Sequence, residues 1–334
     1  MKHDFNITLL LLAMFFVTQI IGLVVIDAYS SQRTINVVEN GKVVERTINN
    51  TIPYGMEPPS GIEPQVSVVS IVIAIIIATF LFFILTRLKA SFLIKAWFFF
   101  VVLMTSSISI NALFWLMNPS WDRVLTMDLG YPLTIVSILA LAIAFILTFY
   151  KIVRRNFIVH NFTELLIYPG LAAIFVPILN VTWIIVLLLL ISVYDMYAVW
   201  KSKHMVKLAK YQIQNLKIFT GFFVPYLTNE SLATLRKIKK IKDIKLNEVK
   251  EKTKDIKVSL AILGGGDIAF PLIFAGVILR AFSFLEAVIV AFAATLSLLF
   301  LFIIAKKEKF YPAMPFITAG CLIGYMIILL MTKI

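Results

Sequence analysis

Two acidic residues stand out in this sequence because each lies deep within an apolar stretch. Asp195 occurs in ISVYDMYAVW, and Asp267 follows three glycines in SLAILGGGDIAFPLIFAG. Two carboxyl groups that meet in a low-dielectric environment cannot both be ionised, so they share one proton and titrate as a pair. Such a pair can hydrolyse a peptide bond, because the ionised member takes a proton from water while the protonated member donates to the scissile carbonyl. The two residues therefore predict acid–base hydrolysis.

The three glycines before Asp267 need an explanation, because glycine weakens a helix by about 1 kcal/mol relative to alanine. Gly264, Gly265 and Gly266 carry no side chain. A substrate backbone or a neighbouring helix can therefore approach Asp267 closely, and we expect the glycines to line a substrate site. Tyr194, next to Asp195, points about 100° away from it on a helix and is assigned only to lining that site.

A proline motif in KFYPAMPFITAGCLIGY is the third feature that could bind a substrate. It comprises Pro312, Ala313, Met314 and Pro315. Proline leaves backbone carbonyls without donors, and irregular backbone at membrane depth survives only where it lines a cavity. An extended substrate could pair with these free groups. The alternative is that Pro312 simply begins a helix.

Composition shows where these residues must lie. The chain has 334 residues, of which 60% are hydrophobic and only 15% are charged, whereas a soluble domain has about a quarter charged residues. Runs such as VSIVIAIIIATFLFFIL and VTWIIVLLLLISVY are too apolar for a soluble surface. The fold class is therefore an all-α, multi-pass membrane protein.

We expect about nine transmembrane helices. Their approximate limits are 5–28, 66–88, 91–116, 132–153, 157–175, 178–200, 258–279, 284–305 and 312–331. The first is read as an uncleaved anchor, because its apolar core is long and no small-x-small cleavage site follows. The chain then divides into a six-helix half at 1–200 with a loop at 29–65, a basic loop at 201–256, and a three-helix half at 257–334.

Basic residues predict the orientation. They concentrate in the even-numbered connections, and the sixth holds about half of all lysines and arginines. The others in even connections are Arg87, Lys89, Lys151, Arg154, Arg155, Lys306, Lys307 and Lys309. By the positive-inside rule these connections are cytoplasmic, so the N-terminus lies inside and the C-terminus outside.

Two connections have recognisable patterns. RTINVVENGKVVERTI alternates β-branched and polar residues around Asn40-Gly41, which predicts a small external β-hairpin; the alternative is a disordered loop. The sixth connection begins with a predicted helical extension and contains FTGFFVPYL, an apolar, strand-like segment. Its lysine-rich remainder is interpreted as a solvated tether that favours anionic lipid headgroups rather than nucleic acid.

Depth distinguishes the two aspartates from other charged residues. Asp195 lies about six residues before Lys201, roughly 9 Å along a helix, and Asp267 about ten residues beyond Lys257, roughly 15 Å. Because both enter from one loop on consecutive spans, antiparallel neighbours could bring them face to face. Either aspartate alone could instead be a structural hydrogen-bond partner or a proton relay, but the matching depth favours the pair.

Most other charged residues have interfacial explanations. Lys95 can extend its side chain to the interface, and Glu164 is expected to be solvated or paired with a basic neighbour such as Arg155. The three histidines are scattered, HExxH is absent, and the single cysteine, Cys321, allows no intrachain disulfide. We therefore expect no metal site and no organic cofactor.

Together these motifs resemble those of the presenilin and signal peptide peptidase family. Tyr194-Asp195, Gly264-Gly265-Gly266-Asp267 and Pro312-Ala313-Met314-Pro315 resemble its YD, GxGD and PALP motifs, with Met314 in place of the usual leucine. The order of the motifs, the nine spans and the large loop between the aspartates also match, and the compact size looks most like archaeal presenilin homologues. The resemblance implies an intramembrane aspartyl protease with Asp195 and Asp267 as its catalytic pair.

The resulting hypothesis is a multi-pass protease of the cell membrane that cleaves transmembrane peptides, proteins or remnant signal peptides. Its partners are these substrates and membrane lipids, with no nucleic acid and no obligatory partner subunit. A proton-coupled transporter or ion-leak channel could use the same aspartates as a relay, although no internal repeat supports one. A prepilin-type peptidase shares GxGD but would lack the proline motif, and an inactive scaffold would not explain two deep carboxylates.

Overall fold

The structure is a computed structural model of the 334-residue chain. It describes residues 5–30, 32–39, 42–56, 64–88, 90–117, 124–126, 133–154, 156–202, 219–227, 258–305 and 311–332. Most of the lysine-rich sixth connection, including its predicted helical extension, lies outside these residues.

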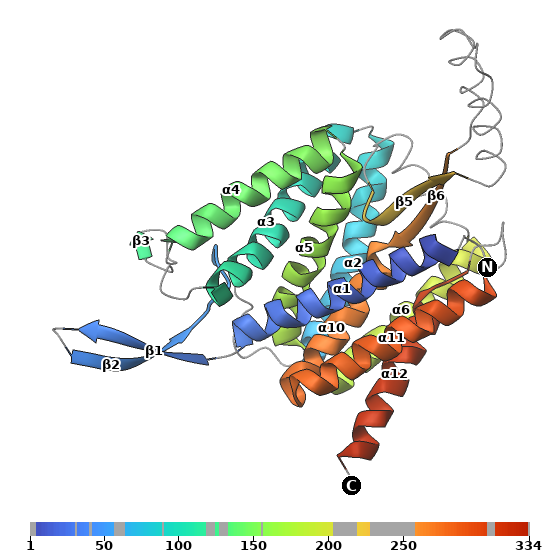
Figure 1. The fold of residues 1–334 in the computed structure, drawn as a ribbon. Helices are drawn as coiled ribbons and strands as arrows, with labels where there is room; N and C mark the ends of the chain where they lie inside the picture. The colour runs from blue at the N-terminus through green and yellow to red at the C-terminus, as the bar shows by residue number, and fades with distance from the viewer. Residues whose placement is uncertain are drawn as a thin grey trace, which may run out of the picture.

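The described residues form a bundle of apolar helices (Figure 1). The helices are α1 (Phe5–Ser30), α2 (Pro64–Arg87), α3 (Ser91–Met117), α4 (Ile135–Phe149), α5 (Phe157–Phe175), α6 (Val181–Met196), α10 (Gly265–Ala281), α11 (Phe284–Ile304) and α12 (Met314–Met331). Short π-helical segments, η2 (Tyr150–Arg154) and η4 (Tyr197–Ser202), extend α4 and α6, and the 3-10 helix η3 (Val176–Ile178) extends α5. Among the described residues, eight helices are long and apolar enough to cross a membrane, and the 17-residue α10 is the counterpart of the remaining predicted span.

The predicted span at 258–279 is wrong in its first third. Residues Val258–Gly264 form strand β6, and the helix begins only at Gly265. A strand rises about 3.3 Å per residue, against 1.5 Å for a helix, so the depth that we assigned to Asp267 rested on the wrong geometry. The glycines therefore lie at a strand-to-helix junction, where their low helix propensity costs little.

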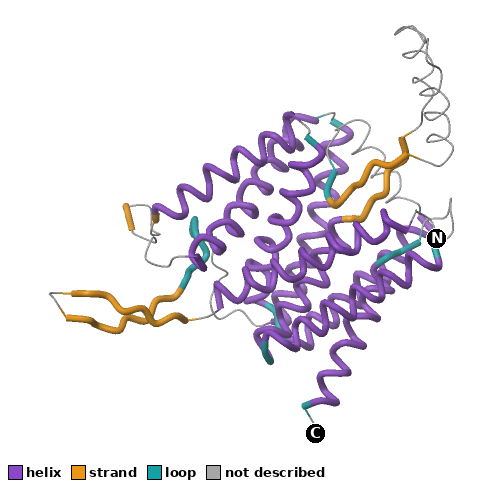
Figure 2. Tube along the Cα trace, in the orientation of Figure 1, coloured by secondary structure: helices purple, strands orange, loops and turns teal. Residues whose placement is uncertain are grey.

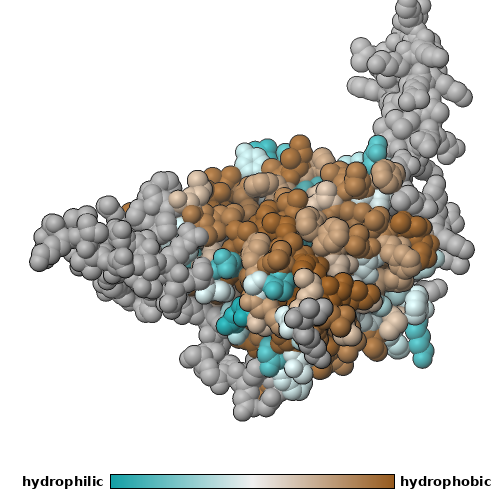
Figure 3. Space-filling view, turned by 60° about the horizontal axis from the view of Figure 1, so that its bottom comes forward, coloured by the Kyte–Doolittle hydropathy of each residue, from teal (hydrophilic) through white to brown (hydrophobic). Residues whose placement is uncertain are grey.

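The core of the bundle is formed around α10. Nearly every residue from Ile268 to Leu279 is buried, and α10 packs against α1, α5, α6, α11 and α12. By contrast, α2 buries little of its surface, with Ile76 62% and Phe80 65% exposed. The face shown in Figure 3 is dominated by hydrophobic residues, as expected for a surface in contact with lipid.

Three two-stranded antiparallel sheets accompany the helices (Figure 2). Strands β1 (Gln32–Glu39) and β2 (Lys42–Asn49) confirm the predicted hairpin, with Glu39 opposite Lys42, and its Asn40-Gly41 turn lies outside the described residues. Strands β5 (Gly221–Leu227) and β6 pair at the opposite end of the bundle from this hairpin (Figure 1). The third pair, β3 (Val124–Thr126) with β4 (Leu133–Thr134), was not predicted.

One buried ion pair confirms that Glu164 is paired with a basic neighbour. Lys151 is buried within η2, and its ammonium group contacts a carboxylate oxygen of Glu164. Glu164 is likewise buried, so it is not solvated, and its described basic partner is Lys151. Arg155, which was named as an example of such a neighbour, lies outside the described residues.

Candidate active site

Asp195 lies near the end of α6, two residues before the helix changes to the π-helical η4. Asp195 is only 7% exposed, whereas the preceding Tyr194 is 49% exposed. The two adjacent side chains therefore point in different directions, as helical geometry requires. Asp195 faces the interior of the bundle, and Tyr194 lines an apolar cavity between α6 and α2.

The Asp195 carboxylate is held by the N-terminus of α12. The Met314 N–H donates a hydrogen bond to Asp195 Oδ2 at 3.2 Å, and the Ala313 N–H is a second backbone donor. Ala313 is the N-cap residue of α12, and Met314 is its first helical residue. Helix N-termini present unpaired N–H groups and a partial positive charge, so this contact stabilises a carboxylate inside the bundle.

Asp267 is held in a related way by its own helix. It is the third residue of α10, and its carboxylate accepts a hydrogen bond from the backbone of Gly264, the N-cap residue. An acidic side chain three residues after the N-cap satisfies one of the free N–H groups at a helix start. The switch from β6 to α10 at Gly264 therefore fixes where this carboxylate lies.

The two carboxylates interact. Asp195 exerts an electrostatic effect on Asp267, which places both acids within one site where α6, α10 and α12 converge. A hydrogen bond of 2.7 Å between the hydroxyl oxygens of Ser192 and Thr318 joins α6 to α12 one turn from Asp195. The predicted meeting of the two acids on consecutive spans thus agrees with their placement in the structure.

The three glycines have different surroundings. A Cβ atom on Gly264 would lie 3.1 Å from Asp267 Oδ2, and one on Gly265 would lie 2.8 Å from the Tyr168 hydroxyl oxygen. A Cβ atom on Gly266 would meet only Phe270, at 3.8 Å, and this residue is exposed. Gly264 and Gly265 therefore allow close packing within the chain, and Gly266 leaves space open beside Asp267.

The proline motif has a contact that the sequence did not reveal. We expected its backbone to pair with a substrate strand, and in the structure two of its N–H groups bind Asp195. Pro312 precedes α12 and Pro315 lies in its first turn, so the helix starts two residues later than Pro312. Pairing of this motif with a substrate remains a prediction, and the contact with Asp195 is an additional role.

A second unpredicted contact supports the start of α10. Gln19 of α1 donates its side-chain N–H to the carbonyl of Ile268 at 3.1 Å, directly after Asp267. Pro271 lacks the N–H that would otherwise bond the carbonyl of Asp267. A polar residue in the apolar first helix was the only sequence signal for this contact.

Metal coordination is not indicated at this site. The described part of the chain contains no group of three or more histidine, cysteine or acidic residues arranged to hold a metal ion.

The space around Gly265 and Gly266 predicts how replacing each of them with alanine changes the stability of the protein. Gly265→Ala should lower the melting temperature of the detergent-solubilised protein, because its methyl group overlaps the Tyr168 hydroxyl, and overpacking costs about 1–3 kcal/mol. Gly266→Ala is the matched control and should melt at or above the parent temperature, since it meets no close atom and alanine favours the helix. Equal melting temperatures for the two variants would contradict this packing.

Comparisons with known proteins agree with the geometry. No curated sequence shows significant similarity to the chain. Solved structures are similar to it. One is a presenilin family intramembrane aspartate protease in space group C222, with a TM-score of 0.57 and 17% identity, covering 96% of this chain and 97% of that one. Another is a presenilin family intramembrane aspartate protease in space group P2, with a TM-score of 0.57 and 19% identity, covering 95% of each chain.

The similarity to these structures concerns the fold alone. The family model described as signal-peptide peptidase, presenilin aspartyl protease matches residues 46–334, which is most of the chain and includes all three motifs. The chain therefore belongs to the signal-peptide peptidase and presenilin aspartyl protease family.

Proposed function

We propose that this protein is an endopeptidase that cleaves peptide bonds within transmembrane segments or remnant signal peptides, using Asp195 and Asp267. The observation that carries the proposal is that both carboxyl groups lie at helix N-termini where α6, α10 and α12 converge, and that Asp195 acts electrostatically on Asp267. Asp195 is bonded to two backbone N–H groups and Asp267 to one. We place its action in the cell membrane, with transmembrane substrates and lipids as its partners and no nucleic acid. No metal, organic cofactor or obligatory subunit is invoked.

The reaction needs one proton shared between the two acids. The ionised carboxylate removes a proton from water while the protonated carboxyl donates its proton to the scissile carbonyl oxygen, giving a gem-diol. When the gem-diol collapses and the C–N bond breaks, the acid that was protonated by water donates its proton to the leaving amine, and the ionised acid takes a proton from one gem-diol hydroxyl. The pair ends with one proton, as it began.

A lateral route for the substrate is suggested by the cavity between α2 and α6. Its volume is about 590 Å³. It is lined by Val72, Ile76, Thr79, Phe80, Phe83, Leu190, Ile191 and Tyr194. Phe80 and Leu190 are also strongly exposed, so the cavity reaches the lipid-facing surface. A helical substrate could enter here from lipid and reach Asp195, which follows Tyr194.

Strand β6 offers a second element for substrate binding. Gly221 and Phe223 of β5 direct their backbone groups towards α5, where His160 and Asn161 bind them. In an antiparallel pair, residues that face each other either both bond across the sheet or both point their backbone groups outward. Ile262 lies opposite Phe223, and Leu260 lies opposite Pro225, two residues further along β5. The backbone N–H and C=O groups of Leu260 and Ile262 therefore point away from β5. Both of these residues are substantially exposed.

The edge of β6 that no described strand covers lies directly before Asp267 in the chain. A substrate helix that unwinds exposes peptide groups that must be satisfied in the membrane. Adding a strand to an open sheet edge satisfies them through backbone hydrogen bonds. We infer that the unwound substrate pairs with β6, which brings its peptide bond towards the two carboxyls. Unwinding before chemistry predicts slow turnover.

The first test removes each carboxylate separately. Asp195→Asn and Asp267→Asn should each reduce cleavage of a transmembrane peptide by at least about 100-fold, because each change removes a proton-transfer partner. Cleavage is measured by mass spectrometry with purified protein in liposomes. Asp27→Asn, at the end of α1, removes the same charge elsewhere and should cleave as the parent does. Persistent cleavage in either site variant, or proton flux without proteolysis in the parent, would reject the proposal.

The second test removes one outward N–H from β6. Ile262→Pro should lower kcat/KM about fivefold or more, since one backbone hydrogen bond contributes about 1 kcal/mol. The hairpin should persist, because proline is tolerated where the N–H points away from the neighbouring strand, and Pro225 of β5 already occupies such a position. Ile262→Val keeps the N–H and serves as the control. Parental kcat/KM in a folded Ile262→Pro protein would contradict substrate pairing at this edge.

A further inference from the structure

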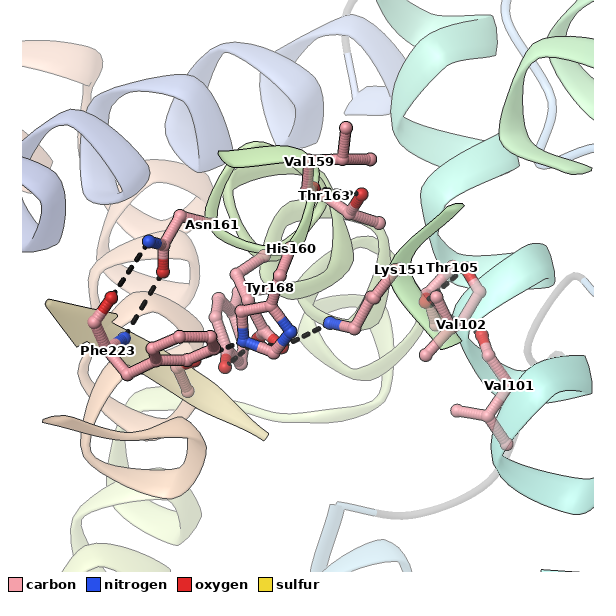
Figure 4. Close-up of polar contacts among 12 residues, drawn as sticks. Val101, Val102, Thr105, Lys151, Val159, His160, Asn161, Thr163, Tyr168 and Phe223 are labelled. Atoms are coloured by element: carbon pink, nitrogen blue, oxygen red, sulfur yellow. Dashed lines mark hydrogen bonds and ion pairs between the residues drawn. The ribbon is translucent and has the colours of Figure 1, made fainter. Parts of the chain in front are cut away.

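A buried polar network lies beside the candidate active site, on one face of α5. It joins Lys151 of η2 to Glu164 and Tyr168 of α5. The Lys151 ammonium contacts Glu164 Oε1, and the Tyr168 hydroxyl donates to Glu164 Oε2, so both carboxylate oxygens are used. All three residues are at most 4% exposed. Figure 4 shows Lys151 reaching from its own helix towards the side chains of His160 and Tyr168.

The cost of this network calls for an explanation. Removing a lysine and a glutamate from water is expensive, and a buried ion pair is often no more stabilising than apolar residues of similar volume. The proposed acid–base chemistry uses none of these groups. The presence of these groups is therefore better explained by the structural elements that they hold in place than by the energy of the ion pair itself.

The network ends at the start of α10. The Tyr168 hydroxyl oxygen would be 2.8 Å from a Cβ atom on Gly265, so it lies almost against that backbone. Tyr168 also interacts electrostatically with Asp267, which lies two residues after Gly265. Its ring packs edge-on against Phe222 of β5, with centroids 6.2 Å apart. Tyr168 thus touches the junction at which β6 becomes α10.

The same face of α5 holds β5. His160 Nε2 lies 2.9 Å from the Gly221 carbonyl, and because a carbonyl can only accept, this nitrogen carries the proton. Asn161 bonds to both backbone groups of Phe223, donating to its carbonyl at 2.9 Å and accepting from its N–H at 3.2 Å. Figure 4 shows this two-point contact between α5 and the strand. Since β5 is paired with β6, α5 fixes both sides of the junction before Asp267.

We propose that Tyr168 is a positioning residue for the cleavage reaction, and that Glu164, neutralised by Lys151, holds its hydroxyl in place. The inference rests on the proposed function. The hydroxyl acts through the Gly265 backbone to set the position of the Asp267 carboxyl relative to Asp195. It neither contacts the substrate nor transfers a proton.

The decisive variant is Tyr168→Phe, which keeps the ring packing and removes only the hydroxyl. We expect kcat for the transmembrane peptide to fall about 10- to 100-fold with KM unchanged, because a small displacement of a catalytic group is costly. The melting temperature should fall moderately, because Glu164 Oε2 loses its donor inside the bundle at a cost of about 1–3 kcal/mol, so cleavage is measured well below that temperature. Tyr54→Phe is the matched control: it removes a hydroxyl that bonds Ser107 and Ser137, distant in the sequence from both acids, and should keep the parental kcat.

Two double variants separate the hydrogen bond from the charge. Lys151→Met/Glu164→Gln removes both charges and retains an amide oxygen for Tyr168, so it should keep a near-parental kcat. Lys151→Met/Glu164→Leu removes the acceptor as well and should be as slow as Tyr168→Phe. Parental kcat in Tyr168→Phe, or equal kcat in the two double variants, would overturn the assignment.

A readout without proteolysis distinguishes failure of this inference from failure of the proposed function. Asp267→Cys in a Cys321→Ser background places the only thiol of the chain at the site. Adding Tyr168→Phe should change its rate of modification by a methanethiosulfonate reagent at least threefold, whereas adding Tyr54→Phe should not. An unchanged rate in the Asp267→Cys/Cys321→Ser background counts against the positioning role. A rate that changes as expected in that background, together with a parent protein that does not cleave the peptide, counts against the protease alone.

Discussion

The structure depends on keeping two carboxyl groups that act electrostatically on one another inside an apolar bundle. A charged side chain in hydrocarbon is costly unless it is paired or hydrogen-bonded. Here each acid receives backbone N–H groups from the beginning of a helix: Asp195 from α12, and Asp267 from α10, its own helix. Those N–H groups would otherwise be unsatisfied in the membrane. The carboxylates give them hydrogen-bond acceptors, and the N–H groups in turn stabilise the carboxylates.

This arrangement dictates much of the surrounding architecture. Because Asp267 must lie within the first turn of a helix, the chain before it cannot continue that helix, and β6 takes its place. Strand β6 needs a partner, which β5 provides, and β5 in turn is fixed to α5. The well-packed part of the bundle thus surrounds Asp267, while the weakly packed α2 faces Tyr194, the residue before Asp195, across an apolar cavity. A site held firmly on one side and bordered by a loosely packed helix on the other suits a reaction whose substrate must enter from lipid.

Several features could be predicted from the sequence because they follow from local patterns. Long uncharged runs indicated the helices, and the predicted limits of α5 agree with its observed bounds, Phe157–Phe175. Alternation around Asn40-Gly41 indicated the β1–β2 hairpin. The two aspartates were recognised because carboxylates are rare at membrane depth, and their position on consecutive spans suggested that they meet.

Other features depended on tertiary contacts and could not be predicted in this way. The apolar run before Gly264 suits a buried helix or a strand equally well, and only its pairing with β5 decides between them. The bonds from Ala313 and Met314 to Asp195 join distant backbone and side-chain groups, so no local pattern indicates them. One signal was present but not used: His160, Glu164 and Tyr168 recur every four residues along α5, which places them on one helix face.

The most direct test of the central claim measures whether positions 195 and 267 are neighbours in the membrane. Cys321 is the single cysteine, so Asp195→Cys and Asp267→Cys can be combined in a Cys321→Ser background and treated with a short bifunctional thiol reagent. Ser192→Cys with Thr318→Cys, whose hydroxyl oxygens lie 2.7 Å apart in the parent, shows what a neighbouring pair yields. The account predicts that the 195–267 pair is bridged as efficiently as this reference pair. Bridging of the reference pair alone would contradict the meeting of the two acids.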